Sequence, residues 1–283
     1  MSEVGEFLKA KRAAVSPEEV GLPAVGNPRR VPGLRREEVA LLASVSVDHY
    51  TRLEQGRVSA ASENLLAGIA RALRLTPEEH EYLRMLVQAR PRRRRAAEPE
   101  VGAPLRDLLA ALTAPALVLG PRTDILAWNA GAAALFLDFA EIPPPERALV
   151  RMVFLEPRMR GLFVHWDQVA AEAVDRLRVA AARMPGDPQL ARLVGELSVR
   201  DADFRRWWAG HGVRTLAGGR KRLWHPTVGE LELDWQVLQV LTAPDQTLVT
   251  YTASEGSPSH LALRILCSWN ADAPVYRPDV IDL

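Results

Sequence analysis

The sequence predicts two domains, an all-α bundle of five helices followed by an α+β domain. Its 283 residues are enough for two hydrophobic cores. Apolar residues recur with a helical period through the first 90 residues, whereas later segments alternate with the period of a strand. All seven tryptophans lie in the second part, at positions 128, 166, 207, 208, 224, 235 and 269. Length, periodicity and composition therefore point to the same division.

Charge separates the same two parts. Over the whole chain, 36 basic side chains nearly balance 35 acidic ones, which taken alone argues against a nucleic-acid binder. However, residues 1–95 carry 17 basic and 12 acidic side chains, and residues 96–283 carry 19 and 23. The first part is thus basic and the second acidic. We assign residues 1–90 to the first domain, 91–104 to a linker and 105–283 to the second domain.

The linker contains four consecutive arginines, Arg92–Arg95. Such a run is either a solvated linker or a contact to the DNA backbone, and the sequence leaves both open.

No apolar run approaches the roughly 18 residues that span a bilayer, and the N-terminus lacks the apolar region of a signal peptide. The single Cys267 forms no internal disulfide and no zinc site by itself. We therefore expect a cytoplasmic globular protein without membrane or structural metal.

Helix start and stop signals order the first domain. Helices are expected over 3–14, 35–43, 47–55, 62–75 and 76–89, with a single turn near 16–21. Ser46 and Ser62 are the expected N-caps, Thr76 opens a capping box with Glu79, and Gly56 ends the third helix. Residues 22–33 contain three prolines and two glycines and are expected to form a loop.

The second and third helices are joined by a turn of three to four residues, which is the geometry of a helix-turn-helix motif. We expect Val39, Leu41 and Leu42 to face inward, and Leu41, Tyr50 and Leu53 to be core residues rather than contacts. The segment VALLASVSVDHYTRLEQG, residues 39–56, resembles the helix-turn-helix of the Cro/cI-type (XRE) repressors. The longer pattern RRVPGLRREEVALLA…VSVDHYTRLEQG is similar to the MmyB-like branch. The turn position that usually holds glycine is Ser44, which predicts modest strain.

The resemblance implies that the start of the third helix faces base edges, at Val47, Asp48 and Arg52. Arg52 is long enough to bind guanine O6 and N7, and Val47 can contact a thymine methyl group. Asp48 either accepts from cytosine N4 or stabilises the helix N-terminus. The expected phosphate contacts, which are otherwise plain polar surface, are Arg35, Arg36, His49 and Thr51. Arg29 and Arg30 on the long loop are candidates for an adjacent backbone or minor groove.

In the second domain the pattern predicts two strands, a series of helices and a closing antiparallel sheet, the order of an α+β sensor fold. The helices are expected over 105–113, 130–136, 145–155, 157–182, 189–197, 201–209 and 259–268. The strands are expected over 116–119, 124–128, 219–225, 229–240 and 246–253. Asn129 is the expected cap of the short helix after the second strand.

Four segments of this domain resemble the PAS-like ligand-binding domain of MmyB-like regulators. They are DILAWN at 124–129, Arg151…Phe154…Pro157, Phe204-Arg205…Trp207 and His225-Pro226…Val228-Gly229. The chain departs from the pattern at Arg147-Ala148, where relatives commonly have Arg-Asn. The resemblance implies a buried apolar cavity for an elongated lipid-like ligand, with a fatty acid as the best guess for a bound effector.

The candidate ligand-binding residues are Trp128, Phe136, Arg151, Phe154, Phe163, Trp166, Trp207 and Trp235. Large aromatic side chains fill cores as readily as they line pockets, so both interpretations stay open. Arg151 lies in an apolar segment and needs a partner, either an internal carboxylate or a ligand headgroup. His225 is expected to be a hydrogen-bonded structural histidine.

The six histidines have no HExxH or HxH spacing, and no GxSxG motif occurs, so catalysis has no visible carrier. Together with this absence, the resemblance implies a non-enzymatic transcription regulator that binds operator DNA as a homodimer and senses a small amphipathic ligand. The alternative is a constitutive DNA-binding regulator whose second domain serves only dimerisation or protein docking.

Overall fold

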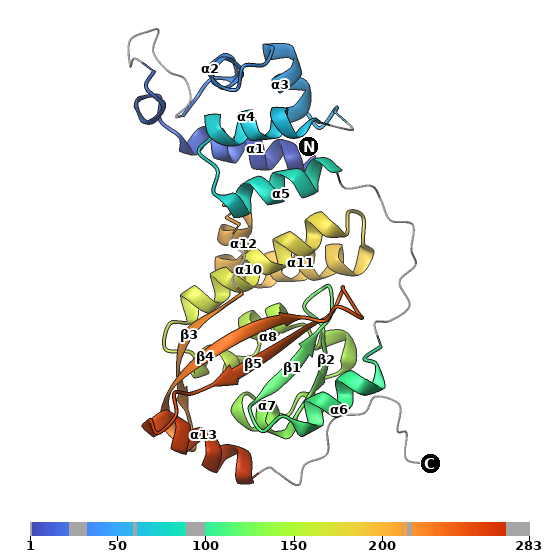
Figure 1. Cartoon of the computed structure of the whole chain (residues 1–283), viewed down its shortest axis with the longest axis vertical. Coiled ribbons are helices and arrows are strands. Elements are labelled where there is room, and N and C mark those ends of the chain that lie inside the picture. The colour runs from blue at the N-terminus through green and yellow to red at the C-terminus, as the bar shows by residue number, and fades with distance from the viewer. Residues whose placement is uncertain are drawn as a thin grey trace. The chain divides into compact units, whose positions relative to one another are not determined.

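The computed structural model describes residues 2–22, 33–58, 61–88, 100–210, 212–213 and 217–269. The chain forms two compact units, one built mainly from residues 1–92 and the other mainly from residues 93–283 (Figure 1). The Arg92–Arg95 run and the loop arginines Arg29 and Arg30 lie outside the described residues.

The first unit is the predicted bundle of helices. They are α1 (Glu3–Ala14), α2 (Arg36–Leu42), α3 (Val47–Glu54), α4 (Glu63–Ala72) and α5 (Pro77–Gln88), with a 3₁₀ turn, η1 (Glu18–Val20), after α1. The predicted caps are confirmed, because the hydroxyls of Ser46 and Ser62 accept from the backbone N–H groups three residues on. Thr76 and Glu79 form the predicted capping box. The core includes Phe7 and Tyr82, whose rings meet edge to face at 5.1 Å.

One core prediction in this unit is wrong. Leu41 was expected to face inward, but it is 71% exposed. The second helix is only seven residues long, and its buried positions are Val39 and Ala40, followed by Ala43 at its C-cap. With 3.6 residues per turn, these positions place Leu41 on the opposite side of the helix. Tyr50 and Leu53 are buried as predicted.

The second unit has the predicted α+β order. Its strands are β1 (Ala116–Leu119), β2 (Ile125–Trp128), β3 (Gly218–His225), β4 (Gly229–Gln239) and β5 (Thr247–Thr252). Its helices are α6 (Ala103–Ala111), α7 (Ala130–Leu135), α8 (Leu149–Leu155), α9 (Pro157–Leu162), α10 (Trp166–Arg183), α11 (Pro188–Arg200), α12 (Ala202–Ala209) and α13 (Pro258–Trp269). Two 3₁₀ turns, η2 (Phe139–Glu141) and η3 (Pro144–Glu146), follow α7. The strands form one antiparallel sheet in the order β2-β1-β5-β4-β3 (Figure 1).

The two faces of this sheet have different neighbours. Strand side chains alternate between faces, and helix α6 packs on one face, in a cluster that includes Leu109, Val118 and Leu248. We call this face the outer face. Residues of the opposite, inner face contact α7, α9 and α10: Tyr251 meets Phe136, Leu223 pairs with Phe163, and Lys221 pairs with Glu172. The rings of Phe136, Phe163 and Tyr251 meet between the inner face and these helices.

Two predicted helices are interrupted in the structure. The helix expected over 157–182 breaks between Leu162 and Trp166, because Phe163 forms a β-bridge with Leu223 and the N–H of Val164 donates to Arg222 at 3.0 Å. The helix expected over 145–155 begins only at Leu149. Before it, the backbone of residues 147–149 pairs with residues 123–125 next to β2. Both interruptions come from pairing with strands that are distant in the sequence.

The predicted linker is also shorter at its C-terminal end. Ala103 and Pro104, assigned to the linker, form the first turn of α6, where proline is well tolerated because the first N–H groups of a helix have no partner inside it. None of the helices in the described ranges has the length and apolar character needed to cross a membrane.

Candidate DNA-binding and ligand-binding sites

Helix α3 is positioned to act as a recognition helix. It begins at the Ser46 cap and ends at Gly56, which has a positive φ of 69° and is followed by a bond from the Arg57 N–H to the Arg52 carbonyl. The three predicted base-reading residues, Val47, Asp48 and Arg52, are all exposed. The structure therefore places them together on the accessible side of one short helix.

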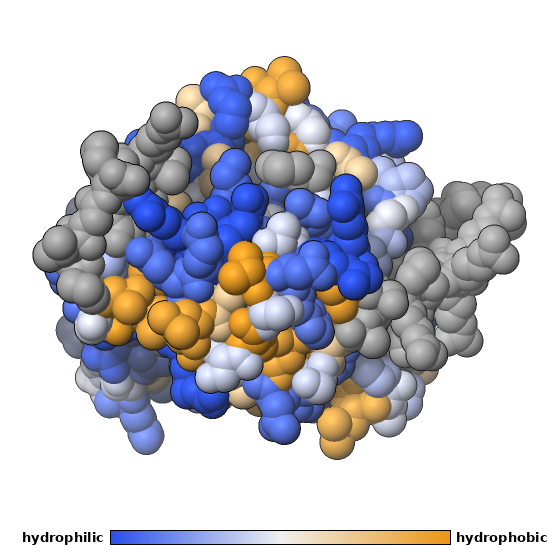
Figure 2. All heavy atoms as spheres, turned by 90° about the horizontal axis from the view of Figure 1, so that it is seen from above, coloured by the Kyte–Doolittle hydropathy of each residue, from blue (hydrophilic) through white to orange (hydrophobic). Residues whose placement is uncertain are grey.

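The remaining predicted contacts are distributed around this helix. His49 is exposed and Thr51 is half-buried. Arg35 is exposed at the N-cap of α2, where its backbone N–H donates to the carboxylate of Glu38 at 2.6 Å. The end of the unit that carries α2 and α3 is largely hydrophilic, with hydrophobic side chains between the polar ones (Figure 2). Leu41 and Val47 are the large hydrophobic side chains that are exposed on these two helices.

The turn between α2 and α3 is tight. Ser44 has a φ of 57°, so the predicted left-handed conformation of this non-glycine residue is confirmed. Its N–H donates to Leu41, and the Val45 N–H donates to Ala40. Gly68 on α4 packs against this turn, since a Cβ there would lie 2.8 Å from the carbonyl oxygen of Ala43. Close packing by α4 thus supports the angle between α2 and α3.

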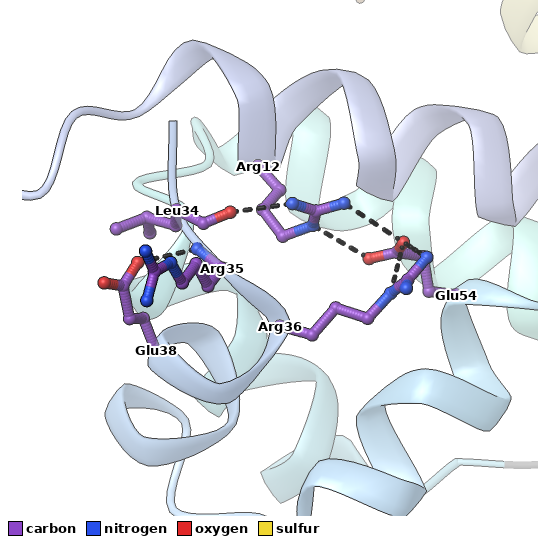
Figure 3. A network of polar contacts seen from close by, with 6 residues as sticks. All are labelled: Arg12, Leu34, Arg35, Arg36, Glu38 and Glu54. Atoms are coloured by element: carbon purple, nitrogen blue, oxygen red, sulfur yellow. Dashed lines mark hydrogen bonds and ion pairs between the residues drawn. The ribbon is translucent and has the colours of Figure 1, made fainter. Parts of the chain in front are cut away.

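A buried carboxylate ties α3 to two other helices (Figure 3). The side chain of Glu54 is only 3% exposed. It accepts from Arg12 of α1 at 3.0 and 3.3 Å and from Arg36 of α2 at 2.9 and 2.8 Å. Arg12 also donates to the carbonyl oxygen of Leu34 at 2.7 Å. Each of the three helices therefore contributes one charged side chain to the network.

Burial by itself would raise the pKa of Glu54, but the hydrogen bonds and charges of Arg12 and Arg36 outweigh burial and lower it. Burial likewise opposes the charge of Arg12, whose pKa is nevertheless raised by Glu54. Arg36 was expected to be a phosphate contact or plain polar surface, and the role of Glu54 was not predicted. The signal was present, because an acidic residue directly after the buried Leu53 and before the terminating Gly56 needs a cationic partner if it is buried.

In the second unit, the predicted ligand residues form two aromatic groups. Distances between ring centroids define the first group. The ring of Phe136 lies 5.0 Å from that of Tyr251 and 6.4 Å from those of Phe139 and Phe163. The ring of Phe139 in turn lies 5.2 Å from that of Trp128. In the second, the ring of Phe154 meets Trp166 at 5.6 Å and Phe204 at 5.3 Å. Phe136 is only half-buried, whereas Trp128, Phe154 and Phe163 are buried.

Polar contacts fix several of these aromatic side chains. The indole N–H of Trp166 donates to the carbonyl oxygen of Val153 at 2.9 Å, and the Arg160 guanidinium lies 3.7 Å from its ring centroid. Trp207 on α12 is half-buried beside Arg206. Such contacts are typical of packed core or surface aromatics.

Arg151 has internal partners. Its guanidinium binds Glu196 of α11 at 3.1 Å and Glu146 at 2.8 Å. Of the two alternatives for Arg151, the structure therefore provides the internal carboxylate. Arg147, at the departure from the family pattern, is also buried and donates to the carbonyl oxygens of Ile142 and Ala140.

Asn129 and His225 hold the strand ends. Asn129 caps α7, and its amide group also bonds to the backbone of Leu112, Ala114 and Ala116. His225 bonds through Nε2 to the carbonyl oxygen of Ala134 and accepts the Thr227 N–H at Nδ1. This pattern requires the neutral tautomer with hydrogen on Nε2. Burial lowers the pKa of His225, and the hydrogen bond to Ala134 opposes this effect. Its two hydrogen bonds confirm the structural role predicted for His225.

Two pockets in the described part of the second unit lie along β3 and β4. One, of about 350 Å³, is lined by charged side chains of these strands and by the segment at 254–259. The other, of about 620 Å³, is lined by Trp235. No other predicted ligand-binding residue lines either of these two pockets. None of the rings in the groups around Phe136 and Phe154 borders either of these two pockets.

The comparison with protein-family models decides which family the chain represents. Residues 101–266, more than half of the chain, match the model of the MmyB-like transcription regulator ligand binding domain. The chain belongs to the MmyB-like transcription regulators. Residues 3–83 match a helix-turn-helix domain, which makes this regulator a DNA-binding protein with a separate ligand-binding domain. No curated protein matches the chain.

The ligand-binding domain of this MmyB-like regulator contains a charged group that the sequence analysis missed. Lys221 of β3 pairs with Glu172 of α10, and its ammonium lies 4.7 Å from the ring centroid of Trp235. Arg176, one turn after Glu172, is partly buried in the same region. In the described ranges, no group of three or more histidine, cysteine, aspartate or glutamate side chains is arranged to hold a metal ion.

Proposed function

We propose that this MmyB-like regulator binds operator DNA as a homodimer and responds to a small amphipathic, fatty-acid-like ligand in its C-terminal domain. The observation that carries the DNA part is the joint exposure of Val47, Asp48 and Arg52 at the start of the capped helix α3. Side chains there reach base edges when the helix enters a major groove. The basic charge of the first 95 residues favours the phosphate backbone.

The ligand part rests on the family of the second domain and on its inner face. On that face, Tyr251 meets Phe136 at the C-terminal end of α7, and Phe136 remains half-buried. An apolar chain inserted there would change the packing of these helices. The domain itself is a ligand-binding domain of its family, whereas the fatty-acid-like class of ligand is our proposal.

The proposed mechanism is a population shift. A dimer reads two half-sites only when its recognition helices lie about 34 Å apart. A ligand that prefers one arrangement of the dimer shifts the population toward it, and a coupling of about 1–3 kcal/mol changes DNA occupancy roughly 5- to 150-fold.

A second candidate function is constitutive DNA binding, with the C-terminal domain used only for dimerisation or protein docking. The contacts of Phe154 with Trp166 and Phe204 favour this alternative, because they show aromatic residues already packed against each other.

Native mass spectrometry separates the two candidates. The full-length protein is purified gently and its mass compared before and after delipidation. The proposed function predicts adducts with the masses of amphipathic lipids that disappear on delipidation and return when dodecanoate is added. A delipidated protein that takes up no dodecanoate would instead support the constitutive regulator.

Genome-wide footprinting tests the dimer. Two half-sites whose centres are separated by one helical turn, or by a whole number of turns, are expected for a twofold symmetric protein. A single, non-repeated site would contradict binding as a dimer.

A further inference from the structure

Toward the β3 edge of the sheet, the inner face and helix α10 bring two cations, Lys221 and Arg176, close to one carboxylate, Glu172. In the register of β3, β4 and β5, Lys221, Trp235 and Tyr251 lie on this face. Helix α10 presents Glu172 and Arg176 to it, four residues and therefore about one turn apart. Glu172 pairs with Lys221, which leaves Arg176 as the second cation of the group.

Arg176 has no hydrogen-bonded carboxylate of its own, although the charge of Glu172 acts on it from one turn away. Within the described ranges, its guanidinium forms no hydrogen bond and no ion pair. Burial lowers the pKa of Arg176, and the nearby Tyr251 and Glu172 oppose this effect. Burial also lowers the pKa of Lys221, and the positive charge of Arg176 lowers it further. A guanidinium stays protonated in proteins, so a partly buried one such as Arg176 gains from an anionic partner. Arg151, by contrast, already has two carboxylates.

The surroundings of Arg176 combine this charge with apolar surface. Tyr251 is buried, and its ring meets Phe136 edge to face at 5.0 Å. Phe136 in turn lies 6.4 Å from Phe163. A molecule with a carboxylate at one end and a hydrocarbon chain at the other matches both parts of this region.

We propose that Arg176 binds the carboxylate of the ligand, with the hydroxyl of Tyr251 as a second donor and the chain of the ligand alongside Phe136. This inference rests on the proposed function and assigns its headgroup site. Arginine suits the role because its planar guanidinium donates two parallel hydrogen bonds to one carboxylate. The bound carboxylate would balance the second cation beside the Lys221–Glu172 pair.

The test compares two probes of equal chain length, dodecanoate and 1-dodecanol, by calorimetric titration of the delipidated full-length protein. Wild type is expected to bind dodecanoate at least about 10-fold more tightly than dodecanol, because only the carboxylate can form a charge-assisted hydrogen bond with Arg176. Arg176→Met should lose this preference while binding dodecanol within about 3-fold of wild type. The matched control is Arg192→Met on α11, where the arginine is exposed, and it should behave like wild type.

The outcomes separate this inference from the proposed function. Equal binding of the two probes by wild type, or an unchanged preference in Arg176→Met, would overturn the assignment of Arg176 and leave an amphipathic ligand in place. If Arg176→Met loses both probes, Arg176→Gln is measured in the same way. If Arg176→Gln also binds neither probe, Arg176 is required for the fold of the domain, and the proposal is overturned. A wild type that binds neither probe would reject the proposed function together with this inference.

Discussion

At the scale of single residues, Glu54 explains how a short recognition helix is held in place. Helix α3 has eight residues, too few to be stable by itself. Its last residue is a buried carboxylate bound by Arg12 and Arg36. Removing one partner of such a group leaves buried charge without compensation, which is strongly destabilising. We therefore expect the network to control the position of Val47, Asp48 and Arg52, the predicted base-reading residues, although Glu54 itself is buried.

Glu54→Gln is expected to destabilise the N-terminal domain by about 3 kcal/mol, at the low end of the range for buried pairs because Arg36 remains half exposed. Denaturant unfolding is followed by far-UV circular dichroism. Tryptophan fluorescence serves as an internal control that reports mainly the second unit, because five of the seven tryptophans lie there and only Trp207 and Trp208 fall in a segment that clusters with the first. An unchanged first transition would show that the network contributes little.

The same carboxylate predicts a pH dependence. The pKa of Glu54 is lower in the folded protein than in the unfolded chain, where it is about 4.3. Its contribution to stability is therefore fully present above the unfolded pKa and is lost as the pH falls through the folded pKa. Between pH 5.5 and pH 3.5, the N-terminal transition of wild type should lose more free energy than that of Glu54→Gln. Parallel losses in the two proteins would contradict this assignment.

Arg52 carries the most specific DNA prediction. Arg52→Ala should weaken operator binding by roughly 1–3 kcal/mol and relax the preference at one base position. Competition binding with every single-base variant of the operator measures both effects. Arg84→Ala on α5, where the arginine is held by Glu81, is the matched control and should bind normally. Uniform weakening across all variants would reassign Arg52 to a phosphate contact.

At the scale of elements, the turn between α2 and α3 is where local sequence and fold disagree. Ser44 holds a left-handed conformation that costs a non-glycine residue roughly 1–2 kcal/mol. Ser44→Gly should raise the unfolding free energy of the N-terminal domain by about 0.5–1 kcal/mol, because the added flexibility of the unfolded chain offsets part of the gain. Ser46→Gly, which removes a cap without relieving strain, is the comparison. Destabilisation by Ser44→Gly would show that the hydroxyl has another role.

Elements with local start and stop signals were predictable from the sequence, and those shaped by distant contacts were not. Ser46, Ser62 and Asn129 identify helix starts because capping is a contact within three residues. The break before Trp166 depends on pairing with β3, some 60 residues later, so periodicity alone extends the helix through it.

The candidate sites divide in the same way. The exposed side of α3 follows from one helix and was predicted, although Leu41 was misplaced on the short helix before it. Arg151 was conspicuous because its neighbours in the sequence are apolar, yet the fold gives it two carboxylates. Arg176 lies in a polar stretch of α10, and only the register of β3 to β5 places it against Lys221 and Tyr251.

At the scale of the whole molecule, the near-neutral net charge conceals two units of opposite charge. The basic unit presents α3, and the acidic unit is the ligand-binding domain of an MmyB-like regulator. We propose that occupation of the second unit by a ligand changes DNA binding by the first. Neither unit alone tests this claim, because coupling is a property of the full-length chain.

The most direct test is the affinity of delipidated full-length protein for its footprinted operator, measured by fluorescence anisotropy at fixed salt with and without saturating dodecanoate. We expect the operator affinity to change roughly 5- to 150-fold in wild type and in Arg192→Met, and to change much less in Arg176→Met at the same dodecanoate concentration. Less than a twofold change in wild type, with dodecanoate shown by calorimetry to be bound, would contradict the claim that the ligand controls DNA binding.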